Sequence, residues 1–327
     1  MIDSIGGKPM QRNVSLRLYS TLRAGGTAEL FVEADTVSEL ADISSAAQRE
    51  GLRATTIGWG SNILPSDHGV PGLVVLNNAR RVVAAKTGEV VADSGIGFQE
   101  LFLKTAQAGL HGLEYAVGIP GTLGGALVSN AGAYRSSVSE FITRIEVVHE
   151  GERKWVDPTF MQFSYRDSLL RQPSSPPITL LRVEMKLPTG TSPKAIYDEA
   201  REYQRQRISK QPPPASAGSF FKNVLSRELA DSLDTLTVGM KKAGVVPAGY
   251  LIEASGLKGF RMGGAMMGSR HANFVLNVGN ASAFEIRRLT LFVKKVVREK
   301  FGVELEEEVM YLGDWSAFDS AGDSGPQ

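Results

Sequence analysis

The stretch that decides the fold is GIPGTLGGALVSNAGAY, from Gly118 to Tyr134. It contains five glycines and one proline, and together with the three preceding residues it forms a run of twenty uncharged residues that begins at Tyr115. A transmembrane helix needs about twenty predominantly apolar residues. Here glycine and proline penalise a helix, and threonine, serine and asparagine lower the mean hydropathy. The stretch therefore predicts a chain that turns repeatedly in water and does not span a membrane.

Bare backbone of this kind suits the close approach of a ligand. Glycine permits positive φ and leaves room beside the main chain, and successive N–H groups can form a concavity that binds an anion. A phosphate or pyrophosphate is the natural ligand. The alternative is a tight structural turn in a β-rich domain, and composition alone leaves both interpretations open.

A second glycine cluster, TTIGWGSNILPSDHGVPG, extends from Thr55 to Gly72 and predicts a strand end followed by a turn at Gly58–Asn62. Neither cluster has the G-x-G-x-x-G pattern of a dinucleotide fold or the G-x-x-x-x-G-K-[ST] pattern of a P-loop. A nucleotide bound here would therefore occupy a different type of fold.

The whole chain limits the possible classes of function. Its 327 residues predict two or three domains, and a net charge of +1 argues against nucleic acid or an anionic membrane surface as partner. The chain has no cysteine, which excludes disulfides, thiolate catalysis and iron–sulfur clusters. The N-terminus has no apolar core of the signal-peptide type, so we expect a cytoplasmic protein.

Hydrophobic periodicity predicts short strands, hairpins and a few helices. The predicted helices cover residues 36–51, 98–109, 195–210 and 282–301. The predicted strands cover residues 27–34, 53–57, 72–76, 178–188 and 304–313, with hairpins at 82–95 and 144–157. Strands and helices do not alternate regularly, which favours an α+β fold with mixed sheets.

Eight motifs occur in a fixed order along the chain: TLRAGGTAELFVEA, IGWGSNIL, GLEYAVGIPGTLGGALVSNAGAY, FSYRDS, SAGSFFKN, YLIEASGLKGFRMGGA, SRHANFVLN and LEEEVMYLG. In this order they resemble the family of UDP-N-acetylenolpyruvoylglucosamine reductases (MurB), flavoenzymes of peptidoglycan precursor synthesis. The resemblance covers about residue 15 to residue 314. The short spacing from Arg166 to Ser219 is similar to the subtype that lacks the tyrosine loop.

The resemblance implies an α+β protein with an FAD-binding domain of the vanillyl-alcohol-oxidase (PCMH) type over residues 1–192. This domain would consist of two α+β subdomains with a boundary near residue 78. A smaller α+β substrate-binding domain would cover 193–316, before a disordered tail at 317–327. The resemblance also implies non-covalent FAD, NADPH as hydride donor, a UDP-sugar substrate, no membrane insertion, no metal and a monomer.

By the same resemblance, the two glycine clusters wrap the pyrophosphate and ring of FAD. The implied cofactor-binding residues are Gly58, Trp59, Gly60, Ser61, Asn62, Gly118, Ile119, Pro120, Gly121, Thr122, Gly124, Gly125, Ala126, Asn130, Gly132 and Ala133.

The implied reaction reduces an enolpyruvyl ether to a lactyl ether, and negative charge develops beside a carboxylate. Arg166 could hold both oxygens of that carboxylate. A protonated Glu308 could donate to the developing anion, and Ser219 matches the acid that protonates C2. The structural alternatives are a salt-bridged turn around Arg166, a helix N-cap at Ser219, and a one-residue shift from Glu308 to a neighbouring glutamate.

Tyr165, Lys222 and Asn223 are candidates for binding the diphosphate and sugar of the substrate. Arg205 and Arg207 could add positive charge there, although a solvated helix face explains them equally well.

One segment departs from the family. The 23 residues Val224–Val246 separate the SAGSFFKN motif from the next one, and they predict either an added surface helix or a lid on the substrate side. Two other functions stay open: an FAD oxidase of the same superfamily that acts on a small alcohol or hydroxy acid, and a nucleotide-sugar binding protein with a decayed catalytic site.

Overall fold

The computed structural model describes residues 4–212, 215–316 and 318, and the chain forms two compact units. The first unit contains residues 4–15, 27–60 and 70–209. The second contains residues 16–26, 61–69 and the chain from 210 onward. Each unit combines helices with sheets, and the α+β prediction is confirmed. The predicted tail lies, apart from Phe318, outside the described residues.

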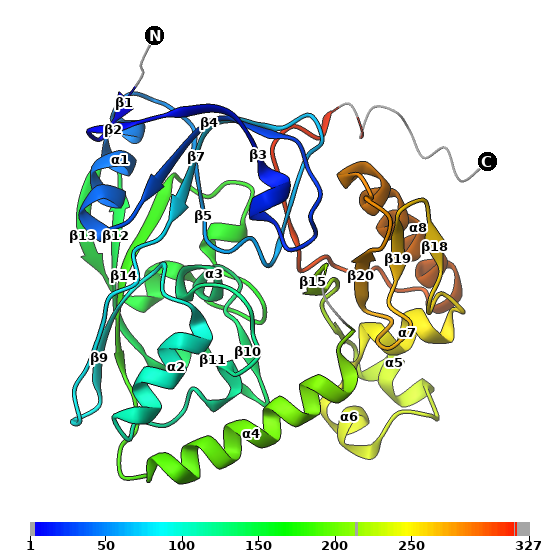
Figure 1. Ribbon diagram of the computed structural model, residues 1–327. Helices are drawn as coiled ribbons and strands as arrows, with labels where there is room; N and C mark the ends of the chain where they lie inside the picture. Colours follow the sequence, from blue (N-terminus) through cyan, green and yellow to red (C-terminus); the bar gives the residue numbers. More distant parts are fainter. Residues whose placement is uncertain (1–3, 213–214, 317, 319–327) are drawn as a thin grey trace. The chain divides into compact units, whose positions relative to one another are not determined.

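Two sheets form the framework of the first unit (Figure 1). One is mixed and has the strand order β3-β4-β7-β5, with β4 and β5 both parallel to β7. The other is antiparallel, in the order β13-β12-β14-β9-β8. The strands are β3 (Gln11–Ser15), β4 (Thr27–Ala34), β5 (Ala54–Ile57), β7 (Val70–Asn77), β8 (Val82–Ala84), β9 (Glu89–Asp93), β12 (Ile142–His149), β13 (Glu152–Val156) and β14 (Ile178–Lys186).

Helix α1 (Val37–Arg49) packs against both sheets, and its first turn is capped by Thr36, whose hydroxyl accepts the Glu39 N–H. Its apolar positions form one stripe, including Leu40 and Ile43, which is fully buried against both sheets. The apolar period of this segment predicts a helix, and the structure confirms it.

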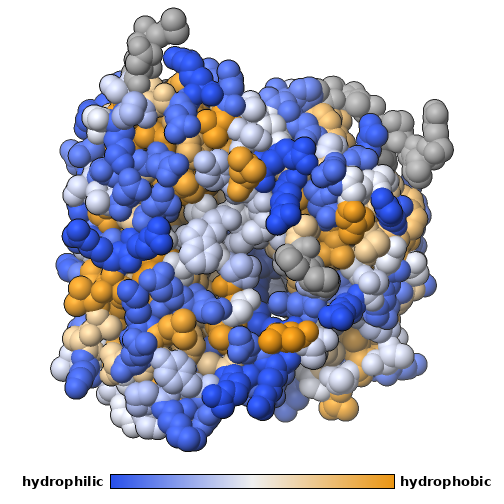
Figure 2. Space-filling model, in the orientation of Figure 1, coloured by the Kyte–Doolittle hydropathy of each residue, from blue (hydrophilic) through white to orange (hydrophobic). Residues whose placement is uncertain are grey.

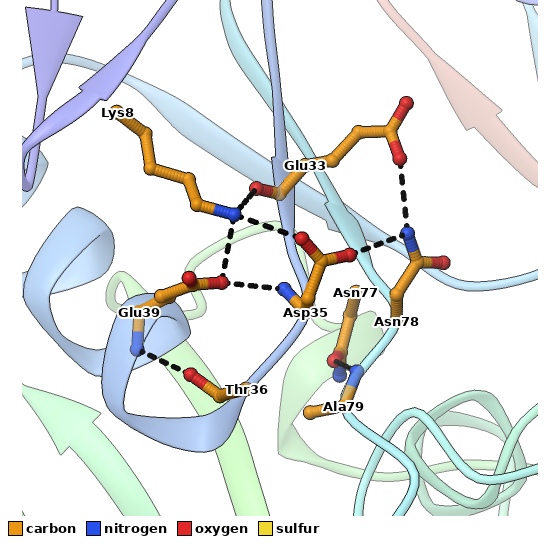
Figure 3. A network of polar contacts seen from close by, with 8 residues as sticks. All are labelled: Lys8, Glu33, Asp35, Thr36, Glu39, Asn77, Asn78 and Ala79. Carbon is orange, nitrogen blue, oxygen red and sulfur yellow. Dashed lines mark hydrogen bonds and ion pairs between the residues drawn. The ribbon is translucent and has the colours of Figure 1, made fainter.

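A network of polar contacts fastens the N-terminal hairpin of β1 (Ser4–Ile5) and β2 (Lys8–Pro9) to this framework (Figure 3). The Lys8 ammonium donates to the Glu33 carbonyl and pairs with Asp35 and Glu39, at 2.9 and 2.8 Å. Asn78, which follows β7, donates to Glu33 and Asp35. These contacts hold the backbone in place where β4 and β7 end.

The uncharged stretch is not a single turn but contains a short helix that the sequence did not predict. A 3₁₀ turn (Glu114–Ala116) precedes it, then α3 (Leu123–Val128) and β10 (Gly132–Ala133), which pairs with β11 (Ser136–Ser137). Thr122 caps α3 through the Gly125 N–H, and Leu123 and Leu127 are fully buried. Burial of these leucines offsets the cost of two helical glycines.

Helix α2 (Phe98–Gln107) confirms the helix predicted at 98–109 and packs against β8, and α4 (Pro193–Lys210) follows β14. Ile196 and Ala200 of α4 are buried in the core of the first unit. The contact boundary therefore falls after Ser209, whereas the functional division at 192/193 stays a prediction. The remaining 3₁₀ turns are Leu16–Tyr19, Val138–Phe141, Pro158–Met161 and Leu169–Arg171.

The second unit is built on an antiparallel sheet in the order β15-β20-β19-β18, with a parallel pair β6-β21. The helix α8 buries one apolar stripe in its core, which matches the predicted helix at 282–301. Asp67 accepts the first N–H groups of this helix, from Ala283 and Phe284. The elements are β6 (Ile63–Pro65), β15 (Ser216–Ser219), α7 (Ala248–Ala254), β18 (Arg261–Met262), β19 (Ala265–Met267), β20 (Phe274–Asn277), α8 (Ala283–Phe301) and β21 (Met310–Leu312).

The segment Val224–Val246 closes on itself because β16 (Val224–Leu225) pairs with β17 (Val245–Val246). Between these strands lie two short helices, α5 (Arg227–Ser232) and α6 (Val238–Ala243), where the sequence predicted one. Ala230 and Leu236 are buried in the core of the second unit, while Val238 is 83% exposed. The segment is therefore partly anchored and partly exposed.

The face of the molecule seen in Figure 2 is mainly hydrophilic, and its hydrophobic residues form small separate patches. Among the described residues, no helix has both the length and the apolar character to cross a membrane. The twenty uncharged residues of the glycine-rich stretch are folded into the first unit.

Candidate active site

The structure brings the two glycine clusters together in the first unit. A Cβ atom at Gly58 would lie 2.4 Å from the Thr122 hydroxyl, so only glycine permits this approach. In the same way, a Cβ at Gly97 would lie 2.5 Å from the indole ring of Trp59. Gly58 is thus required for direct packing of the Thr55–Gly72 cluster against the Gly118–Tyr134 stretch, and Gly97 is required beside Trp59.

Most N–H groups of the Gly118–Tyr134 stretch have internal acceptors. Gly118 donates to the side chain of Gln99, and Leu123 and Gly124 donate to the carbonyls of Ile96 and Ser94. The N–H groups of Gly121 and Thr122 have no acceptor within the described part of the chain. Of the N–H groups predicted to form an anion-binding concavity, two adjacent ones, at Gly121 and Thr122, are therefore available to a ligand. They lie beside the contact between Gly58 and Thr122.

An open groove of about 400 Å³ lies next to these donors. It is lined mainly by apolar atoms, and Trp59, which is 52% exposed, forms one wall. The other lining residues are Gln99, Glu100, Leu103, Gly118, Ile119 and Pro120. An exposed indole beside backbone donors can contact a planar ring while the donors contact a phosphate.

The turn that carries Arg166 is fastened to the glycine-rich stretch. Asn130 donates to the Ser164 carbonyl at 2.9 Å, and the Ser168 hydroxyl donates to the Val128 carbonyl at 2.7 Å. Arg166 itself has φ +54, in the left-handed region that costs a non-glycine residue about 1–2 kcal/mol. Such strain is typical of functional positions. Tyr165, 47% exposed, lies under the Arg166 guanidinium.

Arg207 reaches the same stretch from α4. Its guanidinium donates to the Tyr115 carbonyl at 3.1 Å and lies 5.9 Å from the Tyr134 ring centroid. The Nε atom of Arg207 and the hydroxyl of Tyr115 are both buried without a hydrogen-bond partner. Burial lowers the pKa of Arg207 and raises the pKa of Tyr115.

In the second unit, backbone pairing places Glu308 beside the strand that ends at Ser219. The Glu308 N–H donates to the carbonyl of Phe220 at 2.8 Å, and Phe221 and Glu307 form a β-bridge. Ser219 is the last residue of β15 and pairs with Phe274, so it does not cap a helix.

Among the three consecutive glutamates, Glu306 and Glu307 form ion pairs with different partners. Glu306 pairs with Lys222 at 2.9 Å. Glu307 pairs with Arg287 at 2.6 Å and with Lys294 at 3.5 Å, on the side of α8. Glu306 and Glu307 thus both have ion-pair partners, and the choice of Glu308 as the proton donor stays a prediction.

Asn62 and Asn273 hold this region, and the sequence did not reveal either role. The Asn62 amide donates to the Glu308 carbonyl at 3.0 Å, and the Met310 N–H donates to the Asn62 carbonyl. Asn273, 3% exposed, accepts the Phe221 N–H at 3.0 Å and donates to the Phe221 carbonyl at 2.8 Å. The sequence feature that could have pointed to Asn273 is its position in the motif SRHANFVLN.

The predicted site residues thus divide between the units. Gly58–Gly60, the stretch from Gly118 and the Tyr165–Arg166 turn belong to the first unit, while Ser61, Asn62 and the residues from Ser219 onward belong to the second. Lys222 already has a carboxylate partner, and Asn223 accepts the Ala248 N–H. No cluster of histidines and carboxylates in the described residues could hold a metal ion.

Comparisons with known proteins show the family to which the chain belongs. Residues 208–312 match the C-terminal domain of UDP-N-acetylenolpyruvoylglucosamine reductase, and residues 28–155 match an FAD binding domain. The chain is 36% identical over 309 residues to the UDP-N-acetylenolpyruvoylglucosamine reductase of Synechococcus sp. (strain JA-3-3Ab), covering 94% of this chain and 92% of that protein. It is 38% identical to the enzyme of the same name from Acaryochloris marina, covering 94% of each chain.

A solved structure is also similar: the MurB of Thermus caldophilus has a TM-score of 0.73 and 31% identity, over 93% of this chain and 99% of that chain. Because the match covers 93% of this chain, it includes residues of both units. The chain therefore belongs to the UDP-N-acetylenolpyruvoylglucosamine reductase (MurB) family.

Proposed function

We propose that this chain reduces UDP-N-acetylglucosamine enolpyruvate to UDP-N-acetylmuramate, with FAD as bound cofactor and NADPH as hydride donor, in peptidoglycan precursor synthesis. The observation that carries the proposal is the pairing of the Glu308 N–H with Phe220, next to Ser219, because it gives two proton donors a common support. The cytoplasmic location and the monomeric state stay predictions.

The first unit has the features that an FAD site needs. Gly121 and Thr122 offer two adjacent N–H donors, Trp59 offers a ring face, and the groove beside them holds about 400 Å³. We infer that the loops Gly58–Asn62 and Gly118–Ala133 hold the cofactor, with Asn130 acting through the Arg166 turn. When bound there, FAD would supply the hydride-transfer chemistry that links NADPH to the substrate.

The chain's own residues then control charge and protons. Arg166 binds the substrate carboxylate with two parallel hydrogen bonds and stays charged throughout. A protonated Glu308 donates to the negative charge that develops beside that carboxylate. Ser219 gives its hydroxyl proton to C2, which is feasible because the carbanion is a much stronger base than an alkoxide.

Tyr165, Lys222 and Asn223 are the proposed contacts to the diphosphate and sugar. Lys222 pairs with Glu306, a carboxylate whose side chain is 72% exposed. The Lys222 side chain is only 14% exposed, so a phosphate would reach the ammonium as the solvated Glu306 carboxylate turns into water.

The proposal is tested by absorbance of the purified protein without oxygen. A yellow protein whose flavin is bleached by NADPH and recovers with the enolpyruvyl substrate supports it. Recovery with oxygen alone, and none with the enolpyruvyl substrate, would instead indicate an oxidase.

A further inference from the structure

The segment that leads into β21 has one charged side chain on its inner side. Leu305 and Val309 are both buried in the core of the second unit. Glu307 lies midway between them, and because side chains alternate along an extended strand, it lies on the same side. Its side chain is only 14% exposed. A carboxylate at such a position is costly unless a cation and hydrogen-bond donors satisfy it.

Helix α8 supplies that cation through Arg287. Its guanidinium pairs with the Glu307 carboxylate at 2.6 Å and lies 4.3 Å from the ring centroid of Tyr311. The Tyr311 hydroxyl donates to the same carboxylate oxygen at 3.3 Å, and the Lys294 ammonium lies 3.5 Å from the other oxygen. Groups from α8 and β21 thus hold the Glu307 carboxylate on the inner side of the segment.

The neighbours of Glu307 in sequence lie on the opposite side. Glu306 pairs with the side chain of Lys222, and its carbonyl accepts the Lys222 N–H at 2.8 Å. By the same alternation, Glu308 lies on the side of Glu306. A rotation that brought Glu307 toward water would therefore turn the Glu308 side chain away from that side.

Stability alone is a weak reason for this ion pair. Two apolar side chains of similar volume often stabilise a fold as well as a buried pair does, whereas removal of one partner leaves an uncompensated buried charge. Arg298, on the same helix, shows the ordinary arrangement, because its side chain is 62% exposed and lies 3.8 Å from the Glu304 carboxylate. Arg298 is therefore a matched control for Arg287.

We propose that Arg287 is a positioning residue for Glu308: it holds Glu307 on the inner side and thereby fixes the side on which Glu308 lies. This inference rests on the proposed function, in which Glu308 donates to the charge that develops on the substrate. Because Arg287 acts through Glu307, its loss should affect only the step that uses Glu308. Flavin reduction by NADPH does not use this carboxyl group, whereas reoxidation by the enolpyruvyl substrate does.

The test compares the FAD-loaded wild type with Arg287→Met, Arg287→Lys and Arg298→Met. Stopped-flow absorbance records each half-reaction, and hydrogen exchange of the Glu308 N–H reports its pairing with Phe220 without turnover. In Arg287→Met we expect flavin reduction within about threefold of wild type, and both reoxidation slowed and amide exchange accelerated by at least about tenfold, since a displacement of about 1 Å can cost about a hundredfold. Arg287→Lys keeps the charge and Arg298→Met removes only an exposed pair, so both should stay within about threefold of wild type throughout.

A second substitution separates positioning from a loss of packing. In Arg287→Met, the Glu307 carboxylate loses its shortest ion pair and is drawn toward water. Glu307→Gln in the same chain should restore reoxidation to within about threefold of wild type, because a neutral amide costs less to keep buried. Tyr311→Phe removes one donor to Glu307 and keeps the ring. It should slow reoxidation alone by about threefold, and it decides the question if Arg287→Met does not fold.

The inference is overturned if Arg287→Met slows both half-reactions equally or neither, or if lysine fails as completely as methionine. It is also overturned if Glu307→Gln restores none of the lost rate, or if Arg298→Met gives the same selective loss. A wild-type chain that carries out neither half-reaction overturns the proposed function. In that case faster exchange of the Glu308 N–H in Arg287→Met supports the role of Arg287 in holding the segment, and unchanged exchange overturns it.

Discussion

Substitution of Asn273 tests how the Ser219 segment is positioned. The Asn273 side-chain amide forms two hydrogen bonds with the backbone of Phe221, one with its N–H and one with its carbonyl. The backbone carbonyl of Asn273 also accepts the Phe220 N–H at 2.7 Å. In Asn273→Ala, the N–H and carbonyl of Phe221 lose these partners while the residue stays 1% exposed. Each unsatisfied buried group costs about 1–3 kcal/mol, so the free energy of unfolding should fall by about 2–6 kcal/mol.

The same change should affect the two half-reactions differently. Flavin reduction by NADPH requires no proton from Ser219 and should stay near the wild-type rate. Reoxidation by the enolpyruvyl substrate requires the serine hydroxyl at C2, and a displacement of about 1 Å can cost about a hundredfold. We therefore expect reoxidation to slow by about ten- to a hundredfold in stopped-flow absorbance, with thermal unfolding recorded in parallel.

Asn277→Ala is the matched control for this prediction. Asn277 is the last residue of β20, the strand that begins directly after Asn273, but its amide donates to the Leu22 carbonyl and accepts the Ala281 N–H. It should lose stability without a selective loss of reoxidation. Equal slowing of both half-reactions in Asn273→Ala, or the same split in Asn277→Ala, would refute the positioning role.

Three further predictions concern other parts of the chain. Ser219→Ala should leave flavin reduction intact and slow reoxidation by about 10²–10⁴-fold in stopped-flow absorbance, with partial recovery in Ser219→Cys; equal effects on both halves would exclude serine as the acid. Replacing Val224–Val246 by a short Gly-Ser linker should leave FAD content and NADPH oxidation unchanged, and loss of flavin would show that the segment supports the first unit. Burial raises the pKa of Glu114 above its ordinary 4.5, so the folded chain binds this proton more tightly and loses stability as pH rises through that window. Glu114→Gln should flatten that loss when thermal unfolding is recorded at a series of pH values from 4.5 upward, and an unchanged slope would contradict the assignment.

The long amphipathic elements were predictable from the sequence because their apolar period is set by burial on one side. Helices α1, α2 and α8 and the strands of the two hairpins lie where the pattern placed them. The helix α3 was not predictable from propensity, since two glycines in its first turn oppose a helix and only the burial of Leu123 and Leu127 offsets them. The last strand is shorter than the predicted 304–313, since β21 covers only Met310–Leu312. Before it, Glu306 and Glu307 form ion pairs and Glu307 forms a single bridge, not a continuous ladder.

The motifs predicted which residues to expect in the site, but not the contacts that hold those residues in place. That Gly58 contacts Thr122 depends on the meeting of two loops more than sixty residues apart in sequence. Asn62 was predicted to bind the cofactor, whereas in the structure its amide holds the Glu308 carbonyl. Its contact with FAD stays a prediction. Long-range hydrogen bonds of this kind leave no local period, so one sequence alone does not reveal them.

The most direct test of the proposed enzyme is an anaerobic titration of the purified chain, followed by flavin absorbance. We predict that the protein carries FAD, that NADPH bleaches the flavin without oxygen, and that UDP-N-acetylglucosamine enolpyruvate restores the oxidised spectrum and yields UDP-N-acetylmuramate. A colourless protein that cannot be reconstituted with FAD, or a reduced flavin that the enolpyruvyl substrate does not reoxidise, would contradict the proposed function.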